Sequence, residues 1–308
     1  MVFIKSNIQA IKEYILQQNS PATRKIYEAE LSTFLKVIGN KKYRELLAKD
    51  MSKYQASMQE YSLKNGDKRK ASSSTRARKI SIVNGFLKFI FRRGYIKRDL
   101  SCEMTLPKVN QKPPDVLTME EAQALIRVPD KRTYRGLRDY LILRIFLLTG
   151  CRLNELISIN WGDFSKKYNF WTLLLKGKGD KQRIVKIPKD LEQEIQSYKG
   201  KVEKGSTEPL FITTSKRGLK PTRITAIAIR HMLKKYSKKA LIDKHITPHS
   251  LRHTCFSLEV ANGANVFQVM EQAGHSSLNT TQRYVRLFNS LQVNGVDYNP
   301  LSIKDKSA

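Results

Sequence analysis

The 308-residue chain carries 57 lysines and arginines against 27 aspartates and glutamates, which gives a formal net charge of +30. The excess is spread over both halves, 24 basic against 10 acidic residues up to Asp115 and 33 against 17 after it. This distribution argues against a neutral enzyme with a cationic tail, and it predicts two globular lobes that grip a polyanion, with nucleic acid the favoured partner.

The first hundred residues have the pattern of helices. In NSPATRKIYEAELSTFLKVIG, Ser20 is a candidate N-cap, Pro21 suits the first helical position and Gly39 marks the stop. A further helix is expected from about Ser73 to residue 91, ending at Gly94. Residues 1–105 are predicted to form the first domain.

A proline-rich segment separates this domain from the next. LPKVNQKPPDVLT contains three prolines and few apolar residues, so residues 106–115 are predicted to be an extended linker. Thr118 and Glu121 have the spacing of a capping box that opens a new helix. The second domain is predicted over 116–290, followed by a polar tail at 291–308.

The second domain is predicted to be mostly helical with one strand insertion. FWTLLLKGKGDKQRIVKIP contains two β-prone runs around a turn at residues 177–180, which predicts a hairpin. Helices are expected at about 138–149, 189–199, 221–238, 247–261, 265–273 and 279–287.

Membrane and disulfide-stabilised classes are disfavoured. The apolar stretch that begins at Tyr140 is too short to span a bilayer, and Arg144 interrupts it. No signal-peptide pattern is present, so a cytoplasmic location on nucleoid or plasmid DNA is expected. Cys102, Cys151 and Cys255 are widely spaced without a CxxC, which predicts reduced thiols.

Basic side chains lie at the start of one predicted helix and just after the end of another. Thr247 and Pro248 open a helix whose first turns carry His249 and Arg252 three residues apart, an arrangement that suits phosphate binding. Arg152 follows the buried helix at 138–149. It either pairs with Glu155, three residues on, or is directed at an anion, and Glu155 is expected to orient it without performing chemistry.

Three further residues become candidates for the same site because they accompany these arginines and His249 in the sequence. Lys178 lies between glycines at the predicted hairpin turn, where a long cation can reach a neighbouring cleft and donate a proton. His275 lies where GHSS breaks a helix, and Tyr284 lies on the helix that follows. Each has a plain structural alternative, a solvated lysine for Lys178 and a core residue for Tyr284.

Other chemistries find no support. His245, His249 and His253 are spaced by four, but Thr247 and Pro248 are expected to interrupt the helix between the first two. The pair HxxxH lacks the glutamate of the zincin motif, and no carboxylate cluster suits magnesium. No GxSxG or Cys–His signature appears. No metal and no cofactor is therefore expected.

The motifs together resemble the tyrosine recombinases, or phage integrase family, and among them the compact Xer-like site-specific recombinases. The N-terminal SPATRKIYEAELSTF and SSTRARKISIVNGFLKFI are similar to the core-binding domain of that family. Ala273 departs from it, since leucine is usual before the GH. The matching catalytic pieces follow the family order over about 140 residues: TGCRLNEL with Arg152, KGKGDKQR with Lys178, HSLRH with His249 and Arg252, and AGHSSLNTTQRY with His275 and Tyr284.

The resemblance implies a mainly α fold, with an N-terminal helical core-binding (SAM-like) domain and an α+β catalytic domain that holds a small antiparallel sheet. It implies that Tyr284 attacks a DNA phosphodiester and forms a 3′-phosphotyrosyl bond without metal or ATP. The implied roles of the others are phosphate binding by Arg152, Arg252 and His275, proton exchange with the tyrosine by His249, and protonation of the leaving 5′-oxygen by Lys178.

The resemblance also implies the partners. The basic helix expected at 221–238 would enter the major groove with Arg223 near base edges, and Arg76, Arg78 and Lys79 are candidate DNA contacts of the first domain. A homotetramer on a double-stranded recombination site is implied, for dimer resolution or mobile-element integration and excision. Whether an accessory or partner recombinase takes part is left open.

Two alternatives remain. A type IB topoisomerase-like nicking-closing enzyme uses similar chemistry, but the two-lobe Xer-like pattern favours recombination. A non-catalytic architectural DNA-binding protein fits the charge, but the complete set of candidate catalytic residues argues against it.

Overall fold

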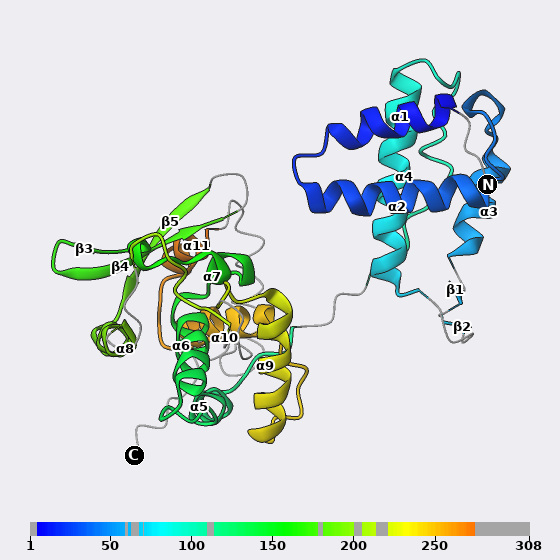
Figure 1. Ribbon diagram of the computed structural model, residues 1–308. Coiled ribbons are helices and arrows are strands. Elements are labelled where there is room, and N and C mark those ends of the chain that lie inside the picture. Colours follow the sequence, from blue (N-terminus) through cyan, green and yellow to red (C-terminus); the bar gives the residue numbers. More distant parts are fainter. Residues whose placement is uncertain are drawn as a thin grey trace, which may run out of the picture. The chain divides into compact units, whose positions relative to one another are not determined.

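The computed structural model describes residues 5–58, 61–62, 68–69, 71–109, 114–177, 181–199, 205–213 and 221–274. The chain divides into two compact units, Met1–Lys112 and Pro113–Ala308. Both are mainly helical, and the second holds a small antiparallel sheet, which confirms the predicted fold class (Figure 1). Within the described ranges, no helix is both long and apolar enough to cross a membrane.

The N-terminal unit is built on three helices that pack against one another, with a fourth against α2. Ser20 precedes α2 in an extended conformation with Pro21 at the first helical position, as the sequence predicts. The Phe34 ring meets Tyr54 edge-on in the core, with ring centroids 5.1 Å apart. The elements are α1 (Lys5–Leu16), α2 (Pro21–Val37), η1 (Tyr43–Glu45), α3 (Ala48–Ser57), β1 (Tyr61–Ser62), β2 (Lys68–Arg69) and α4 (Ser73–Arg92).

The second unit is organised around α6 (Tyr134–Thr149), which is buried on nearly all sides. It is preceded by α5 (Met119–Arg127), whose capping box between Thr118 and Glu121 is present as predicted. Gly150 ends α6 in a left-handed conformation with φ 56°. A Cβ at this position would lie 2.3 Å from the Phe256 ring, so both the turn and its packing require glycine here.

The sheet has the strand order β3-β4-β5, with β3 (Phe164–Lys167), β4 (Phe170–Lys176) and β5 (Gln182–Ile187). β4 and β5 pair antiparallel, which confirms the predicted hairpin, although residues 178–180 of its turn lie outside the described residues. The sequence analysis missed β3. Three of its four residues are exposed, so it lacks the alternation of apolar and polar residues by which a half-buried strand is recognised.

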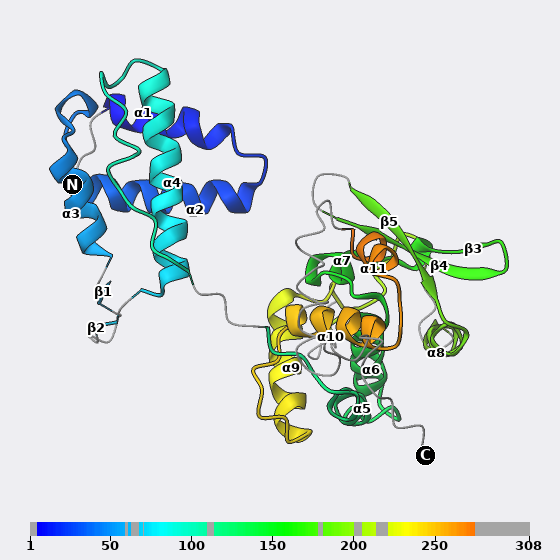
Figure 2. The same cartoon turned by 180° about the vertical axis from the view of Figure 1, so that it is seen from behind.

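Helices surround this sheet and α6. The remaining elements are α7 (Leu153–Ser158), η2 (Trp161–Asp163), α8 (Lys189–Lys199), α9 (Ala226–Lys239), α10 (Pro248–Ala261) and α11 (Val266–Ala273). α10 packs against both α6 and α11, while α8 and α9 lie on opposite sides of the unit (Figures 1 and 2). The helix predicted at 279–287 lies outside the described residues.

The predicted start of the helix at residue 221 is wrong, because α9 begins only at Ala226. The Thr225 hydroxyl accepts a hydrogen bond from the Ala228 backbone N–H (3.2 Å), which caps the helix at this point. Before the cap the chain is extended and forms a β-bridge between Arg223 and Ile212. A side chain that accepts a backbone bond competes with an earlier helical turn, and this decides the boundary.

Candidate phosphate-binding site

Arg152 lies where α6 ends and α7 begins, as the N-cap residue of α7. The Glu155 carboxylate accepts hydrogen bonds from the Arg152 backbone N–H (2.7 Å) and from its Nη1 (2.8 Å). Glu155 therefore orients Arg152, as the sequence analysis expected. The Arg152 side chain remains 40% exposed, whereas that of Glu155 is only 1% exposed. The arginine can thus face a ligand while its partner stays inside the protein.

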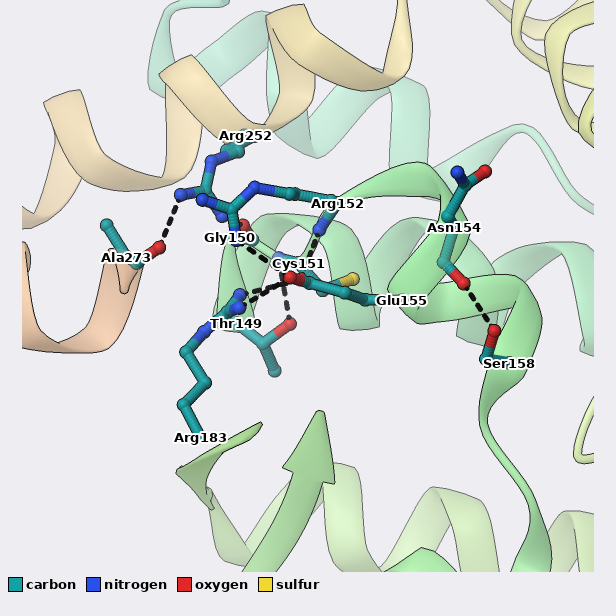
Figure 3. Close-up of polar contacts among 10 residues, drawn as sticks. All are labelled: Thr149, Gly150, Cys151, Arg152, Asn154, Glu155, Ser158, Arg183, Arg252 and Ala273. Atoms are coloured by element: carbon teal, nitrogen blue, oxygen red, sulfur yellow. Dashed lines mark hydrogen bonds and ion pairs between the residues drawn. The ribbon is translucent and has the colours of Figure 1, made fainter. Parts of the chain in front are cut away.

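Arg183 on β5 is a second arginine on the same carboxylate. Its Nη1 donates to Glu155 Oε1 (2.7 Å) and its Nη2 to Oε2 (2.8 Å), so the pair is bidentate (Figure 3). The sequence analysis did not single out this residue. A signal exists, because Arg183 shares one face of β5 with the buried Val185 and Ile187, and an arginine in such an inward series needs a buried partner.

The arginines determine the charge state of Glu155. Burial alone raises the pKa of this carboxyl, but hydrogen bonds from Arg183 and from the backbone and side chain of Arg152 outweigh burial and lower it to about 2. The carboxyl is therefore ionised at any physiological pH. A lowered carboxyl pKa contributes stability at neutral pH, and this contribution is lost as pH falls from the ordinary value near 4.5 toward 2.

Arg252 lies on the second turn of α10 and is 4% exposed. Its Nη1 donates to the Gly150 carbonyl and its Nη2 to the Ala273 carbonyl (2.6 Å), while the guanidinium stacks on the Phe256 ring at 4.8 Å. Arg252 thus joins the end of α6, α10 and the end of α11. Figure 3 shows its guanidinium close to that of Arg152, above the turn at Gly150.

His249 lies on the first turn of α10 and is exposed. The helix start is as predicted, with Pro248 in the first turn and the Thr247 hydroxyl accepting from the Ser250 backbone N–H (3.1 Å). The described residues therefore supply Arg152, His249 and Arg252. Lys178, His275 and Tyr284 lie outside the described residues, and their roles stay predictions.

The predicted DNA contacts of the N-terminal unit lie on α4. Arg78 is exposed. Lys79 pairs with the largely buried Glu30 (3.1 Å), and Arg76 donates to Ser73 Oγ at 3.4 Å. Their role in DNA binding stays a prediction, and Lys79 has an intramolecular role beside it.

The position of Arg223 differs from the predicted one, which was on a basic helix near DNA base edges. Its Nη1 donates to the Ile157 carbonyl (2.7 Å) and its Nη2 to Asn160 Oδ1 (2.7 Å), so the guanidinium is bound to the end of α7. It precedes α9 and does not lie on it. Its role as a base contact stays a prediction, which these two hydrogen bonds disfavour.

A row of cations runs along α9 itself. Arg230, Lys234 and Lys238 are four residues apart and exposed, so they share one face of the helix. Within the described ranges, no carboxylate pairs with any of the three. We call them the α9 cation row. The sequence analysis placed them in a basic helix without naming them, although their spacing was visible.

The α9 cation row borders a cavity of about 460 Å³ between α9 and residues 242–248. The largely buried Ser237 hydroxyl also lines this cavity, and among the residues that the structure describes it has no hydrogen-bond partner. Lys244, at the rim, is already paired with Glu121 at 2.6 Å. A cationic hollow with an unused hydroxyl suits an anionic group such as a phosphate. In the described part of the chain, no three His, Cys, Asp or Glu side chains are grouped as metal ligands.

Comparison with known proteins places the chain in a family. The model of the phage integrase family matches residues 115–290, more than half of the chain. The chain is 32% identical over 259 residues to the tyrosine recombinase XerD of Staphylococcus haemolyticus (strain JCSC1435), which covers 78% of this chain and 85% of that protein. It is 34% identical over 224 residues to tyrosine recombinase XerD of Staphylococcus aureus (strain N315), covering 71% and 74%.

Solved structures share the fold. The XerH site-specific recombinase bound to palindromic difH substrate, in a post-cleavage complex, aligns with a TM-score of 0.68 at 21% identity, over 87% of this chain and 77% of that one. A lambda integrase dimer bound to a COC′ core site aligns with a TM-score of 0.68 at 13% identity, over 89% and 95%. The chain belongs to the phage integrase family and is a tyrosine recombinase.

Proposed function

We propose that this chain is a site-specific DNA recombinase that cuts and rejoins duplex DNA through a 3′-phosphotyrosyl intermediate. The observation that carries the proposal is the convergence of Arg152 and Arg252 at the turn after α6, each held by the protein's own acceptors. Two oriented guanidinium groups fit the non-bridging oxygens of one phosphodiester, and the nearby Glu155 carboxylate is already occupied by Arg152 and Arg183.

In the proposed reaction the Tyr284 oxygen attacks the phosphorus, and the bond from phosphorus to the 5′-oxygen breaks. His249 accepts the tyrosine proton, and Lys178 donates a proton to the departing 5′-oxygen. Arg152, Arg252 and His275 bind the phosphate oxygens and offset the charge that develops on them. The covalent bond keeps the free energy of the phosphodiester, so attack by a 5′-hydroxyl can reseal the strand.

The electrostatics of the site favour this route. A tyrosine has an ordinary pKa of about 10, and positive charge nearby stabilises its phenolate. Arg152, Arg183 and Arg252 bring three positive charges, of which the ionised Glu155 offsets one. The excess supplies the neutralisation of phosphate that magnesium provides in many phosphoryl transfers.

Duplex DNA is the proposed partner. Support comes from the net charge of +30, from the α9 cation row, and from relatives of the same fold whose structures contain their DNA substrate or core site. The opposite face of α9 is fixed to the core, because the Tyr236 hydroxyl donates to the buried Asp139 (2.8 Å). α9 is therefore a firmly held element with a cationic face, which suits contact with phosphates.

We predict that Arg230→Gln/Lys234→Gln weakens DNA binding and lowers its dependence on salt. Two lost phosphate contacts should reduce the slope of log K against log salt by about 2. The matched control is Lys189→Gln/Lys199→Gln on α8, on the other side of the unit, with the same change in charge. Fluorescence anisotropy at several salt concentrations measures both. Equal slopes for the two double variants would show that α9 does not contact the backbone.

Recombination joins two sites, and each site takes two protomers, so a homotetramer on DNA is proposed. Dimer resolution and mobile-element integration or excision both fit this chemistry. A deletion of residues 287–308 that leaves cooperative binding and strand exchange unchanged would show that this segment has no part in assembly.

Covalent trapping without divalent metal tests the proposed function. The substrate is a nicked suicide duplex that carries the recombination site, identified first by footprinting near the gene. We expect wild-type protein to form a protein–DNA adduct that survives denaturing electrophoresis in the presence of EDTA. Binding to the footprinted site without any adduct would contradict the proposal and leave an architectural protein or an enzyme that requires a partner.

A further inference from the structure

We infer that Arg183 is a positioning residue for strand cleavage, which holds Arg152 in its phosphate-binding orientation through the shared Glu155 carboxylate. This inference rests on the proposed function. Arg183 itself is not proposed to bind the substrate, because both of its terminal nitrogens are bound to the buried Glu155 carboxylate, which offsets its charge. The terminal nitrogens of Arg252 are bonded to backbone carbonyls instead.

The two arginines contribute different numbers of side-chain hydrogen bonds to Glu155, and this difference suggests their roles. Arg183 occupies both oxygens of Glu155, whereas Arg152 contributes only Nη1 of its side chain (Figure 3). The Arg152 backbone N–H donates to Oε2 as well, so each carboxylate oxygen already accepts two hydrogen bonds. With Arg183 in place, a second side-chain bond to Arg152 would have to displace one of these four. Without Arg183, the buried carboxylate would have Arg152 as its remaining cationic partner and would draw it inward. Arg183 therefore keeps Arg152 available for phosphate.

Arg183 also touches the segment that leads to His275. Gly274 ends α11 in a left-handed conformation, and a Cβ there would lie 3.3 Å from Arg183 Cδ. The carbonyl of Ala273, the residue before it, accepts a hydrogen bond from Arg252. One arginine thus contacts both the carboxylate that orients Arg152 and the turn before His275. In addition, β5 carries it five residues after Lys178.

An arginine is required for this role. A lysine offers a single point charge and cannot hold both carboxylate oxygens in a fixed plane, so Arg183→Lys should preserve the charge and lose part of the geometry. Arg183→Gln loses both. A misplacement of about 1 Å at a reacting group can cost about 100-fold in rate. We therefore expect adduct formation to slow about 100-fold in Arg183→Gln and about tenfold in Arg183→Lys, with unchanged DNA affinity.

A pH profile separates positioning from a general loss of structure. The groups around Glu155 are Arg152 on α7, Arg183 on β5, Arg252 on α10 and the Cys151 thiol, whose raised pKa of about 12 keeps it neutral. Removal of Arg183 raises the pKa of Glu155 from about 2. The cleavage rate of Arg183→Gln should therefore fall more steeply than that of wild type as pH drops toward the ordinary carboxyl value near 4.5.

The experiment compares single-turnover adduct rates, DNA affinities and melting temperatures of wild type, both Arg183 variants, Glu155→Gln and the combined variants. The control Lys186→Gln removes an exposed cation from the same strand, where it stacks on Phe170, and should cleave like wild type. Because Arg183 acts through Glu155, Arg183→Gln should slow cleavage little further in the Glu155→Gln background.

Three results would overturn the inference. They are a folded Arg183→Gln protein that cleaves at the wild-type rate, an equal loss in Lys186→Gln, and an Arg183→Lys effect of the same size with and without Glu155. The last comparison decides the question if Arg183→Gln does not fold. Failure of the proposed function is distinct, because the wild-type protein itself would then form no adduct.

Discussion

Tyr284→Phe is expected to abolish the covalent protein–DNA adduct and to leave DNA affinity within about twofold of wild type. The change removes only the phenolic oxygen, which is the proposed nucleophile. The expected loss is the largest of any single substitution in this chain. Suicide-substrate trapping of wild type and variant, at equal occupancy of the DNA, measures it.

The chain supplies a matched control in Tyr298, the other tyrosine near the C-terminus. Tyr298→Phe should form the adduct at the wild-type rate. Protease digestion of the wild-type adduct followed by mass spectrometry should place the nucleotide on the peptide that contains Tyr284. If Tyr284→Phe still forms adduct, or if the modified peptide contains Tyr298 instead, the assignment of the nucleophile is wrong.

Arg252→Lys is expected to slow adduct formation by about 100-fold or more, although it keeps the charge. One preorganised hydrogen-bond donor to developing charge is worth about 100-fold to 1,000-fold in rate. Here the planar guanidinium also bonds the Gly150 and Ala273 carbonyls and stacks on Phe256. A lysine cannot donate to both carbonyls at once, so the hydrogen bonds that connect the end of α6 to the end of α11 through residue 252 are lost.

Stability should fall together with activity in this case. Each buried carbonyl left without a donor costs about 1–3 kcal/mol, so the loss of two donors in Arg252→Ala should lower the free energy of unfolding by about 2–6 kcal/mol. Thermal melting of the free protein and adduct rates below the melting range separate the two effects. A folded Arg252→Lys protein that cleaves at the wild-type rate would remove Arg252 from the proposed mechanism.

Arg183→Gln provides an informative contrast to Arg252→Lys. Both arginines are largely buried and both contact the end of α11. Arg252 is proposed to bind the phosphate directly, whereas Arg183 is inferred to act only through Glu155. The two positions should therefore differ in a double-mutant comparison with Glu155→Gln. The loss from Arg252→Lys should persist there, while the loss from Arg183→Gln should nearly disappear.

Local signals in the sequence were sufficient for three of the helix starts and for the class of protein. The Thr118–Glu121 capping box and the Thr247 cap of α10 involve backbone groups within three residues, so neighbouring side chains decide them. At the start of α2, Ser20 makes no side-chain capping bond, and Pro21 at the first helical position is the local signal. The ordered motifs around Arg152, His249 and Arg252 likewise identified the recombinase family.

Local signals failed where a residue distant in the sequence determines the local structure or the contacts of a side chain. β3 was missed because three of its four side chains are exposed and its pairing with the distant β4 residues is what makes it a strand. The residues before α9 have helix-compatible composition, but their bridge to Ile212 and the Thr225 cap delay the helix. Arg223 was expected at DNA bases, yet it binds acceptors more than sixty residues away in the chain.

The sequence by itself therefore determined the family, the order of the candidate catalytic residues and the boundaries set by short-range capping. Only the tertiary structure decided which acceptors each arginine is bonded to and how far it is exposed. Both Arg152 and Arg183 are simply basic residues in the sequence. Their proposed roles differ because one buried carboxylate accepts two side-chain bonds from Arg183 but only one from Arg152, whose side chain stays partly exposed. The physical reason is that guanidinium geometry and burial depend on contacts across 28 residues of chain, which no local pattern records.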